Sequence, residues 1–545
     1  MGKYEQYYIK NKDRMIYVCG SVCDEKKPSV IIFGGVGWYM IGPNRIFIQL
    51  TEMCQRERIN LFLFDYSGCG ESSEDYKNIA LESLISDSSC VLNYVRSIVR
   101  GNIYGIGYGI GNLVLKYFQN RNYIDYYIYY LPVETKNKPL LSYLTQKEIG
   151  VLKNRHQLEI DNNEKEKSEL FRLFVGMLHD CSYNPVSSML IKETFESNTA
   201  YGFDLPSIDR ENTFIITDKI FTVTKADILY VKEFQENLTP NDWYKSPNLW
   251  PEILEYVNKK IVWWITHHTG LQKFQKTYCS ITTKKELVFN NKMQRRQLFT
   301  LENETTLFGA LHYPIKHNLK IPCAIFIPGL GGDKVDNFCC GPRLGDLMAQ
   351  NNIAFIRYDN RYSGTSLLSL EDYNLSDIIC DFREILRYVE SNFKFINTNK
   401  IVLVSWSAGA QVANNVFMKM RDKIQGICYW NPVFLDNVKS DMNLGNTRYI
   451  KRKNGNYVTQ IGGEYLGIKY LQDKKRYSPK EEFDNVDKHQ LFIWSKGGTK
   501  SNEYEYAKDV KKNHQIIDTE GHLFSYDKMT EVFLHTIEWI REIIK

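Results

Sequence analysis

With 545 residues, the chain is too long for one hydrophobic core and suits two domains of roughly 250 to 280 residues each. Hydrophobic residues make up 43% and charged residues 24%, an ordinary globular composition that excludes disorder over most of the chain. The net charge of +5 is small for this length and excludes the strongly basic surface that nucleic-acid binding requires.

The cysteines and the N-terminal residues indicate in which cellular compartment the protein is expected. The 12 cysteines form no C-x-x-C pair, which argues against a zinc site and against a disulfide framework. The opening residues, MGKYEQYYIKNKDR, contain no apolar segment, and no run approaches the ~18 to 20 apolar residues that span a bilayer. We therefore expect a protein of the reducing cytoplasm without a membrane span, a metal or another cofactor.

Short apolar runs alternate with helical stretches through the first half of the chain. This alternation predicts a parallel sheet covered by helices. A long, mainly helical insert is expected at about 135–205. The expected strands lie within 29–35, 59–72, 102–111 and 124–133.

The same pattern restarts in the second half of the chain. After a hairpin at 297–313, strands are expected within 323–333, 353–366, 400–410 and 426–434. Aligning Asp65 with Asp359, and Gly107 with Ser407, gives an offset of about 300 residues. We therefore predict two tandem domains of one fold, 1–275 and 276–545, with the seam near 268–285.

The second half also has an insert, at about 437–480. Like the first insert, it would overhang the carboxyl ends of the strands, where open α/β sheets bind ligands. Both inserts are candidate lids, and surface elaboration is the alternative.

Three motifs of the second half resemble those of the α/β-hydrolase family. PGLGGD (328–333) resembles its oxyanion loop, YDNRYSGTS (358–366) its D-x-R-G-x-G-x-S turn, and SWSAG (405–409) its nucleophile elbow G-x-S-x-G. The elbow departs from the family by Ser405, where a small side chain suffices. YWNPVF (429–434) is similar to exosortase-associated and serine-aminopeptidase-like hydrolases. The resemblance implies that each half is a mostly parallel sheet flanked by helices with a lid insertion.

The elbow indicates a nucleophile. A serine on a strained strand-to-helix turn projects its hydroxyl above the sheet, which is the place of Ser407. The backbone amides of Ala408 and Leu330 are placed to bind a developing oxyanion. His522 follows the last expected strand and precedes the C-terminal helix, where the family has its catalytic histidine, and it would act as the base.

The acid of the triad is less well defined. The family commonly has an aspartate a few residues past the strand within HQLFIWSKGGTKSNEYEYAKD (489–509), but residues 498–500 hold no carboxylate. Asp436, which follows the preceding strand, and Glu503, slightly further along the loop, are equal candidates, and a Ser-His dyad or another acid residue is the alternative. Asp333 and Asp359 are expected to serve turns and helix starts.

The first half keeps the scaffold motifs but lacks the chemistry. Gly107 occupies the expected nucleophile position, and no histidine occurs between His179 and His267. Tyr108 and Cys69 are expected to be structural. The glycines of GIGYGIG (105–111) follow the wrong strand for a dinucleotide-binding fingerprint. We expect this half to be catalytically inactive.

The combined pattern favours a serine hydrolase that cleaves esters, thioesters or amides through an acyl-enzyme. An acyltransferase would use the same site, and a non-catalytic scaffold of two degenerate hydrolase domains is the remaining alternative. The expected partner is a small-molecule, acyl or peptidyl substrate. The N-terminal half would shape or gate the pocket, or recruit a protein partner.

Overall fold

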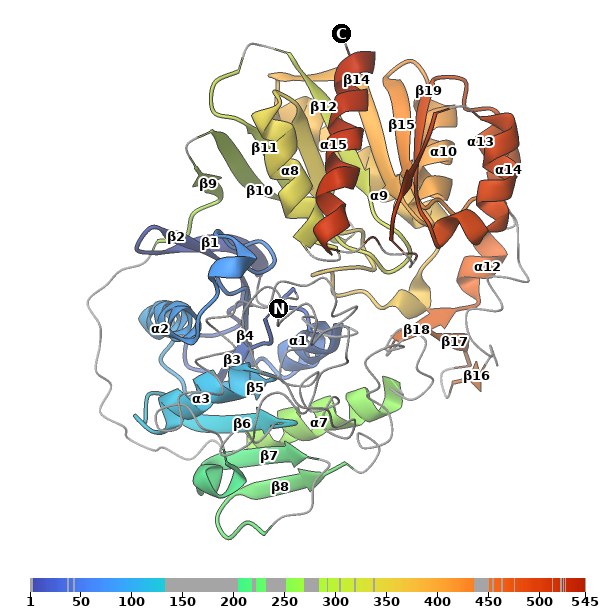
Figure 1. The fold of residues 1–545 in the computed structure, drawn as a ribbon. Helices are drawn as coiled ribbons and strands as arrows, with labels where there is room; N and C mark the ends of the chain where they lie inside the picture. Colours follow the sequence, from blue (N-terminus) through green and yellow to red (C-terminus); the bar gives the residue numbers. More distant parts are fainter. Residues whose placement is uncertain are drawn as a thin grey trace. The chain divides into compact units, whose positions relative to one another are not determined.

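The chain divides into two compact units, Met1–Glu286 and Leu287–Ile461 with Tyr465–Lys545. Each is an α/β structure (Figure 1). The structure, a computed structural model, describes residues 3–36, 39–42, 45–132, 204–217, 222–231, 251–268, 284–291, 293–302, 305–317, 320–336, 339–435, 450–452, 455–461, 464–474, 476–511, 513–519, 522, 524 and 526–544.

The sheet of the first unit has eight strands in the order β1-β2-β4-β3-β5-β6-β7-β8. The hairpin β1–β2 and its pairing with β4 are antiparallel, and the other neighbours are parallel. The strands are β1 Tyr4–Asn11, β2 Arg14–Ser21, β3 Ser29–Phe33, β4 Asn60–Phe64, β5 Ile103–Tyr108, β6 Tyr126–Tyr130, β7 Thr213–Thr217 and β8 Asp227–Tyr230.

Helices cover the first sheet, and the sequences of its central strands reflect this. Every residue of β3, β4, β5, β6 and β7 is buried, as expected for parallel strands packed on both faces. Helices α2 and α3 share a core with β3 and β4, whereas α1 packs on α7. The helices are α1 Ile46–Arg56, α2 Leu81–Ile98, α3 Gly111–Gln119 and α7 Pro251–His267.

The sheet of the second unit repeats this order. Its nine strands run β9-β10-β11-β13-β12-β14-β15-β19-β20, so the eight strands after β9 follow the order of the first sheet. The pairings of β9 with β10, β10 with β11 and β11 with β13 are antiparallel, and the rest are parallel. The strands are β9 Val288–Asn290, β10 Gln294–Glu302, β11 Thr306–Pro314, β12 Ile321–Ile327, β13 Ala354–Tyr358, β14 Ile396–Trp406, β15 Ile424–Trp430, β19 His489–Ser495 and β20 His514–Ile517.

Two apolar clusters hold the second sheet between its helices. Helices α8 and α15 pack on one face, and α9 and α10 pack on the other (Figure 1). The helices are α8 Cys340–Gln350, α9 Leu375–Asn392, α10 Gly409–Met420, α14 Asn502–Val510 and α15 Tyr526–Ile543. Among the described residues, no helix combines the length and apolarity needed to cross a membrane.

Between β15 and β19 the chain leaves the sheet. Here β16 Ile450–Lys451, β17 Tyr457–Ile461 and β18 Glu464–Gly467 form a small sheet, and α12 Lys469–Lys474 and α13 Pro479–Asp484 follow. All of these elements except α13, which extends beyond it, fall within the insert expected at about 437–480. Residues 436–449, and the expected helical insert up to 203, lie outside the described residues. The predicted fold class, mostly parallel sheets flanked by helices, is confirmed.

Candidate active site

The turn between β14 and α10 holds Ser407 in a strained conformation. Its φ is 51°, in the left-handed region that side chains other than glycine rarely adopt, at a cost of about 1 to 3 kcal/mol. Its backbone is held by β15 and the residues after it. The Ser407 amide donates to the carbonyl of Trp430 at 2.9 Å, and its carbonyl accepts from Val433 at 2.9 Å. The turn therefore fixes where the hydroxyl projects.

Gly409, the first residue of α10, explains why the motif requires a glycine after the serine. A Cβ at this position would lie 2.5 Å from the carbonyl oxygen of Ile327 and 2.6 Å from that of Pro328. Both oxygens belong to the backbone, so neither can easily give way. Glycine thus lets α10 start directly against the end of β12.

His522 lies between β20 and α15, and its Nε2 is 2.9 Å from Oγ of Ser407. The structure thus brings together the two side chains that the sequence analysis paired. The imidazole keeps an exposed surface, yet the protein around it removes enough water to lower its pKa below the ordinary value. A lowered pKa keeps the ring neutral, so that Nε2 can accept the serine proton at neutral pH.

The loop after β12 runs against Ser407. A Cβ added at Gly329 would lie 3.1 Å from Cβ of Ser407. In the described part of the chain, neither the amide of Leu330, the next residue, nor that of Ala408 donates to a hydrogen bond. Two amides with unused donor capacity are what an oxyanion site requires.

The acid position is not fixed by the described contacts. Asp436 lies outside the described residues, and Glu503 is in the first turn of α14. The hydrogen bonds described for His522 join it to Ser407 and to Asn431, so no carboxylate is among these partners. Asp436, Glu503 and the dyad all remain predictions.

Asp359 serves the turn after β13, as the sequence analysis expected. Its carboxylate is buried and accepts from the amides of Lys334 at 2.8 Å and Thr365 at 2.9 Å, and from Nζ of Lys334 at 2.6 Å. Asp333 caps a turn by accepting from the amides of Val335 and Asp336. Burial, together with the nearby Asp359, raises the pKa of Asp333 to about 6.

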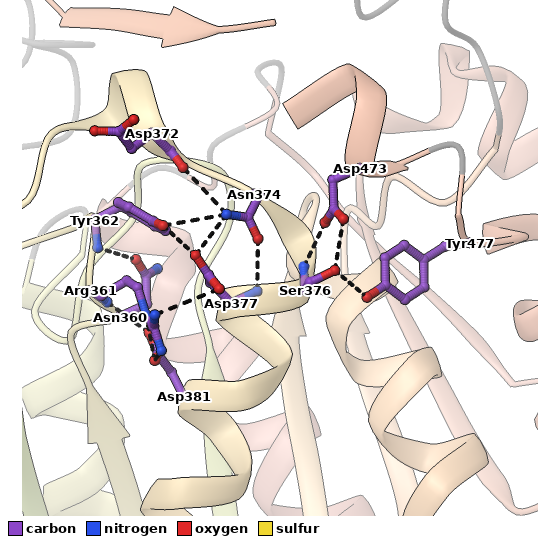
Figure 2. Close-up of polar contacts among 10 residues, drawn as sticks. All are labelled: Asn360, Arg361, Tyr362, Asp372, Asn374, Ser376, Asp377, Asp381, Asp473 and Tyr477. Carbon is purple, nitrogen blue, oxygen red and sulfur yellow. Dashed lines mark hydrogen bonds and ion pairs between the residues drawn. The ribbon is translucent and has the colours of Figure 1, made fainter. Parts of the chain in front are cut away.

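The turn after β13 and the insert are both fastened to α9 (Figure 2). The guanidinium of Arg361 donates to Asp381 at 2.6 and 2.9 Å. From the insert, Asp473 accepts from the amide and the hydroxyl of Ser376, both at 2.7 Å, and Tyr477 lies 2.7 Å from the same hydroxyl. The insert is therefore docked on the first turn of α9, where the backbone amides have no partner within the helix and an anionic group is favoured.

The first unit has the same turn without a nucleophile. Strand pairing places Phe33 opposite Gly107 and Ile327 opposite Ser405, so Gly107 corresponds to Ser405. The residue that corresponds to Ser407 is Gly109, whose φ is 58°. The prediction of Gly107 was wrong by two residues, because glycines alternate along β5 and the sequence alone does not fix their register. Glycine still occupies the position, with no side chain to attack a substrate.

Tyr108 is the last residue of β5. It is buried and packs edge-on against Phe47 at a ring distance of 5.7 Å. Cys69 is also buried in the core of the first unit. Both side chains therefore have the structural surroundings that were expected.

Neither a protein-family model nor a curated protein matches the chain in sequence. Solved structures match about half of it. Est1E from Butyrivibrio proteoclasticus is 16% identical, covers 45% of this chain and 98% of its own, and has a TM-score of 0.36. The esterase domain of a Rhodothermus marinus protein is 14% identical over 46% of this chain and 99% of its own, with a TM-score of 0.36.

The α/β hydrolase GrgF from Penicillium sp. sh18 is 12% identical over 46% of this chain and 99% of its own, with a TM-score of 0.36. One of these proteins is named an α/β hydrolase and another an esterase domain, and the similarity of this chain to them is one of fold alone. The comparisons do not bear on a tandem duplication, which stays a prediction. Among the described residues, no group of three or more His, Cys, Asp or Glu side chains is arranged to hold a metal ion.

Proposed function

We propose that the second unit is a serine hydrolase that cleaves an ester, thioester or amide through an acyl-enzyme. The observation that carries the proposal is the 2.9 Å contact between Oγ of Ser407 and Nε2 of His522, made from a strained turn with φ of 51°. Strain of this kind is kept where the surrounding structure and the function require it. A serine without a base within reach would be a poor nucleophile.

The reaction follows from this arrangement. Ser407 attacks the substrate carbonyl while His522 takes the hydroxyl proton, and the carbonyl oxygen becomes an oxyanion held by the amides of Ala408 and Leu330. Collapse of the intermediate expels the leaving group, which receives the proton from His522. Water, deprotonated by His522, then attacks the acyl-enzyme, and the acid and the free serine are released.

The proposal assigns no chemistry to the first unit. Gly109 stands at its elbow, and this glycine offers no group to form an acyl intermediate. Hydrolysis should therefore depend on the second unit alone for its nucleophile and base.

Labelling by a fluorophosphonate probe tests the proposal. Wild-type protein should react, whereas Ser407→Ala and His522→Gln should not. Ser405→Ala is a matched control. Ser405 is buried two residues away on β14, and its hydroxyl donates only a long hydrogen bond, of 3.5 Å, to the carbonyl oxygen of Cys428. Folded wild-type protein that stays unlabelled would favour the non-catalytic alternative.

A further inference from the structure

Asn431, the residue directly after β15, contacts the His522 segment. Its side chain is 2% exposed. Nδ2 donates to the carbonyl oxygen of His522 at 2.7 Å, and Oδ1 accepts from the amide of Ser495, the last residue of β19, at 2.9 Å. The amide side chain of Asn431, just after the end of β15, thus links the end of β19 to the backbone of His522, the proposed base.

Only an amide can make both contacts at this length. An aspartate would accept from Ser495 but could not donate to the carbonyl of His522, and an aliphatic residue would do neither. The neighbouring loop is shaped around the amide as well. A Cβ at Gly498 would lie 2.2 Å from Oδ1 of Asn431, so a larger residue there would displace it.

A comparison with the first unit distinguishes this role of the Asn431 side chain from what the backbone turn requires. Leu131 follows β6 as Asn431 follows β15, and the two residues have φ of 47° and 40°. The amide of Leu131 donates to Ile216 at 2.8 Å, as that of Asn431 donates to Ile493 at 3.0 Å. The backbone turn therefore forms with leucine, in the unit that has no elbow serine. The amide side chain is present in the unit where it reaches a histidine.

The turn that contains Asn431 also holds Ser407, because Trp430 and Val433, which flank Asn431, form hydrogen bonds with the backbone of Ser407. Trp430 accepts from the amide of Ser407, and Val433 donates to its carbonyl, each at 2.9 Å. One short segment, residues 430–433, thus holds both the nucleophile and the base. It holds Ser407 through main-chain hydrogen bonds and His522 through the side chain of Asn431. A displacement of about 1 Å between reacting groups can cost roughly a hundredfold in rate.

We propose that Asn431 is a positioning residue, which sets the distance between His522 and Ser407 by anchoring the carbonyl of His522. The inference rests on the proposed function. In this arrangement the main chain of His522 is anchored by Asn431, and the anchor does not depend on which group contacts the other ring nitrogen of His522.

Three variants test the inference: Asn431→Asp, Asn431→Leu, which introduces the residue of the first unit, and the control Asn414→Asp. Asn414 is a buried amide of α10 whose Oδ1 accepts from Tyr429 at 2.6 Å, a bond that an aspartate can still accept. The second-order rate of fluorophosphonate labelling would be measured against pH, together with the melting temperature and the fraction of molecules that become labelled.

Both Asn431 variants should label roughly 10- to 100-fold more slowly per active molecule, while Asn414→Asp keeps the wild-type rate. Asn431→Asp should also move the acid limb of the pH profile upward, since a nearby carboxylate favours the protonated imidazole. A lower melting temperature with an unchanged rate and pH profile would show a purely structural role and overturn the inference. Wild-type protein that does not label would instead overturn the proposed function.

Discussion

Replacing Gly409 by alanine tests whether the close approach of α10 to β12 sets the geometry of the elbow. The added Cβ would lie 2.5 and 2.6 Å from two backbone oxygens, where carbon and oxygen normally stay at least ~3.3 Å apart. The start of α10 would therefore have to move by roughly 0.7 to 0.8 Å, and the amide of Ala408 would move with it.

A shift of this size should slow labelling by about 10- to 100-fold. The overpacking should also destabilise the fold by about 1 to 3 kcal/mol. Loss of stability alone could lower the yield of active protein, so the rate must be measured per labelled molecule.

Gly345→Ala, in α8 of the same unit, is the matched control. Its Cβ would lie 2.7 Å from ring atoms of His312, a similar overlap at a position away from Ser407. It should cost comparable stability but keep the labelling rate of the folded molecules. The reasoning is refuted if folded Gly409→Ala reacts at the wild-type rate, or if Gly345→Ala slows labelling as much.

Three further predictions concern charge. The acid limb of the labelling rate should have its midpoint below pH 6.5, because burial lowers the pKa of His522; a midpoint at or above 6.5 would contradict this. Asp359→Asn should cost about 3 to 5 kcal/mol in a urea titration, since it leaves the buried ammonium of Lys334 without its carboxylate partner, and a loss below ~1 kcal/mol would argue against it. Burial and the Arg357 guanidinium lower the pKa of His312 to about 4. The contribution of the neutral His312 side chain to the free energy of unfolding is complete above pH 6.5. Roughly 3 kcal/mol of this free energy is lost as the pH falls from 6.5 to 4, because in this range only the unfolded chain takes up the proton. An equal loss of stability in His312→Gln would contradict this assignment.

The sequence predicted the central strands of both sheets because their apolar runs are uninterrupted, as burial on two faces requires. It also paired Ser407 with His522, whose side chains are in contact. The hairpin β1–β2 was missed. Its two-residue loop is Lys12 and Asp13, with φ of 58° at Lys12, where a glycine or asparagine would have marked the turn.

Other features depend on pairing between distant segments, which sequence patterns do not carry. The match of Gly109 rather than Gly107 to Ser407 follows from the pairing of β3 with β5. Asn431 lies in the quoted motif YWNPVF, yet nothing local indicates that its amide reaches a histidine 91 residues away. A leucine at the corresponding place, Leu131, is the signal that a comparison of the two halves could have used.

The central claim is that Ser407 is the nucleophile, and mass spectrometry of the fluorophosphonate adduct tests it most directly. Trypsin releases residues 401–419 as one peptide, and fragmentation of this peptide distinguishes Ser405 from Ser407. The account predicts one phosphonyl group per molecule, on Ser407, and none in Ser407→Ala. An adduct on another residue, or folded protein without an adduct, would contradict it.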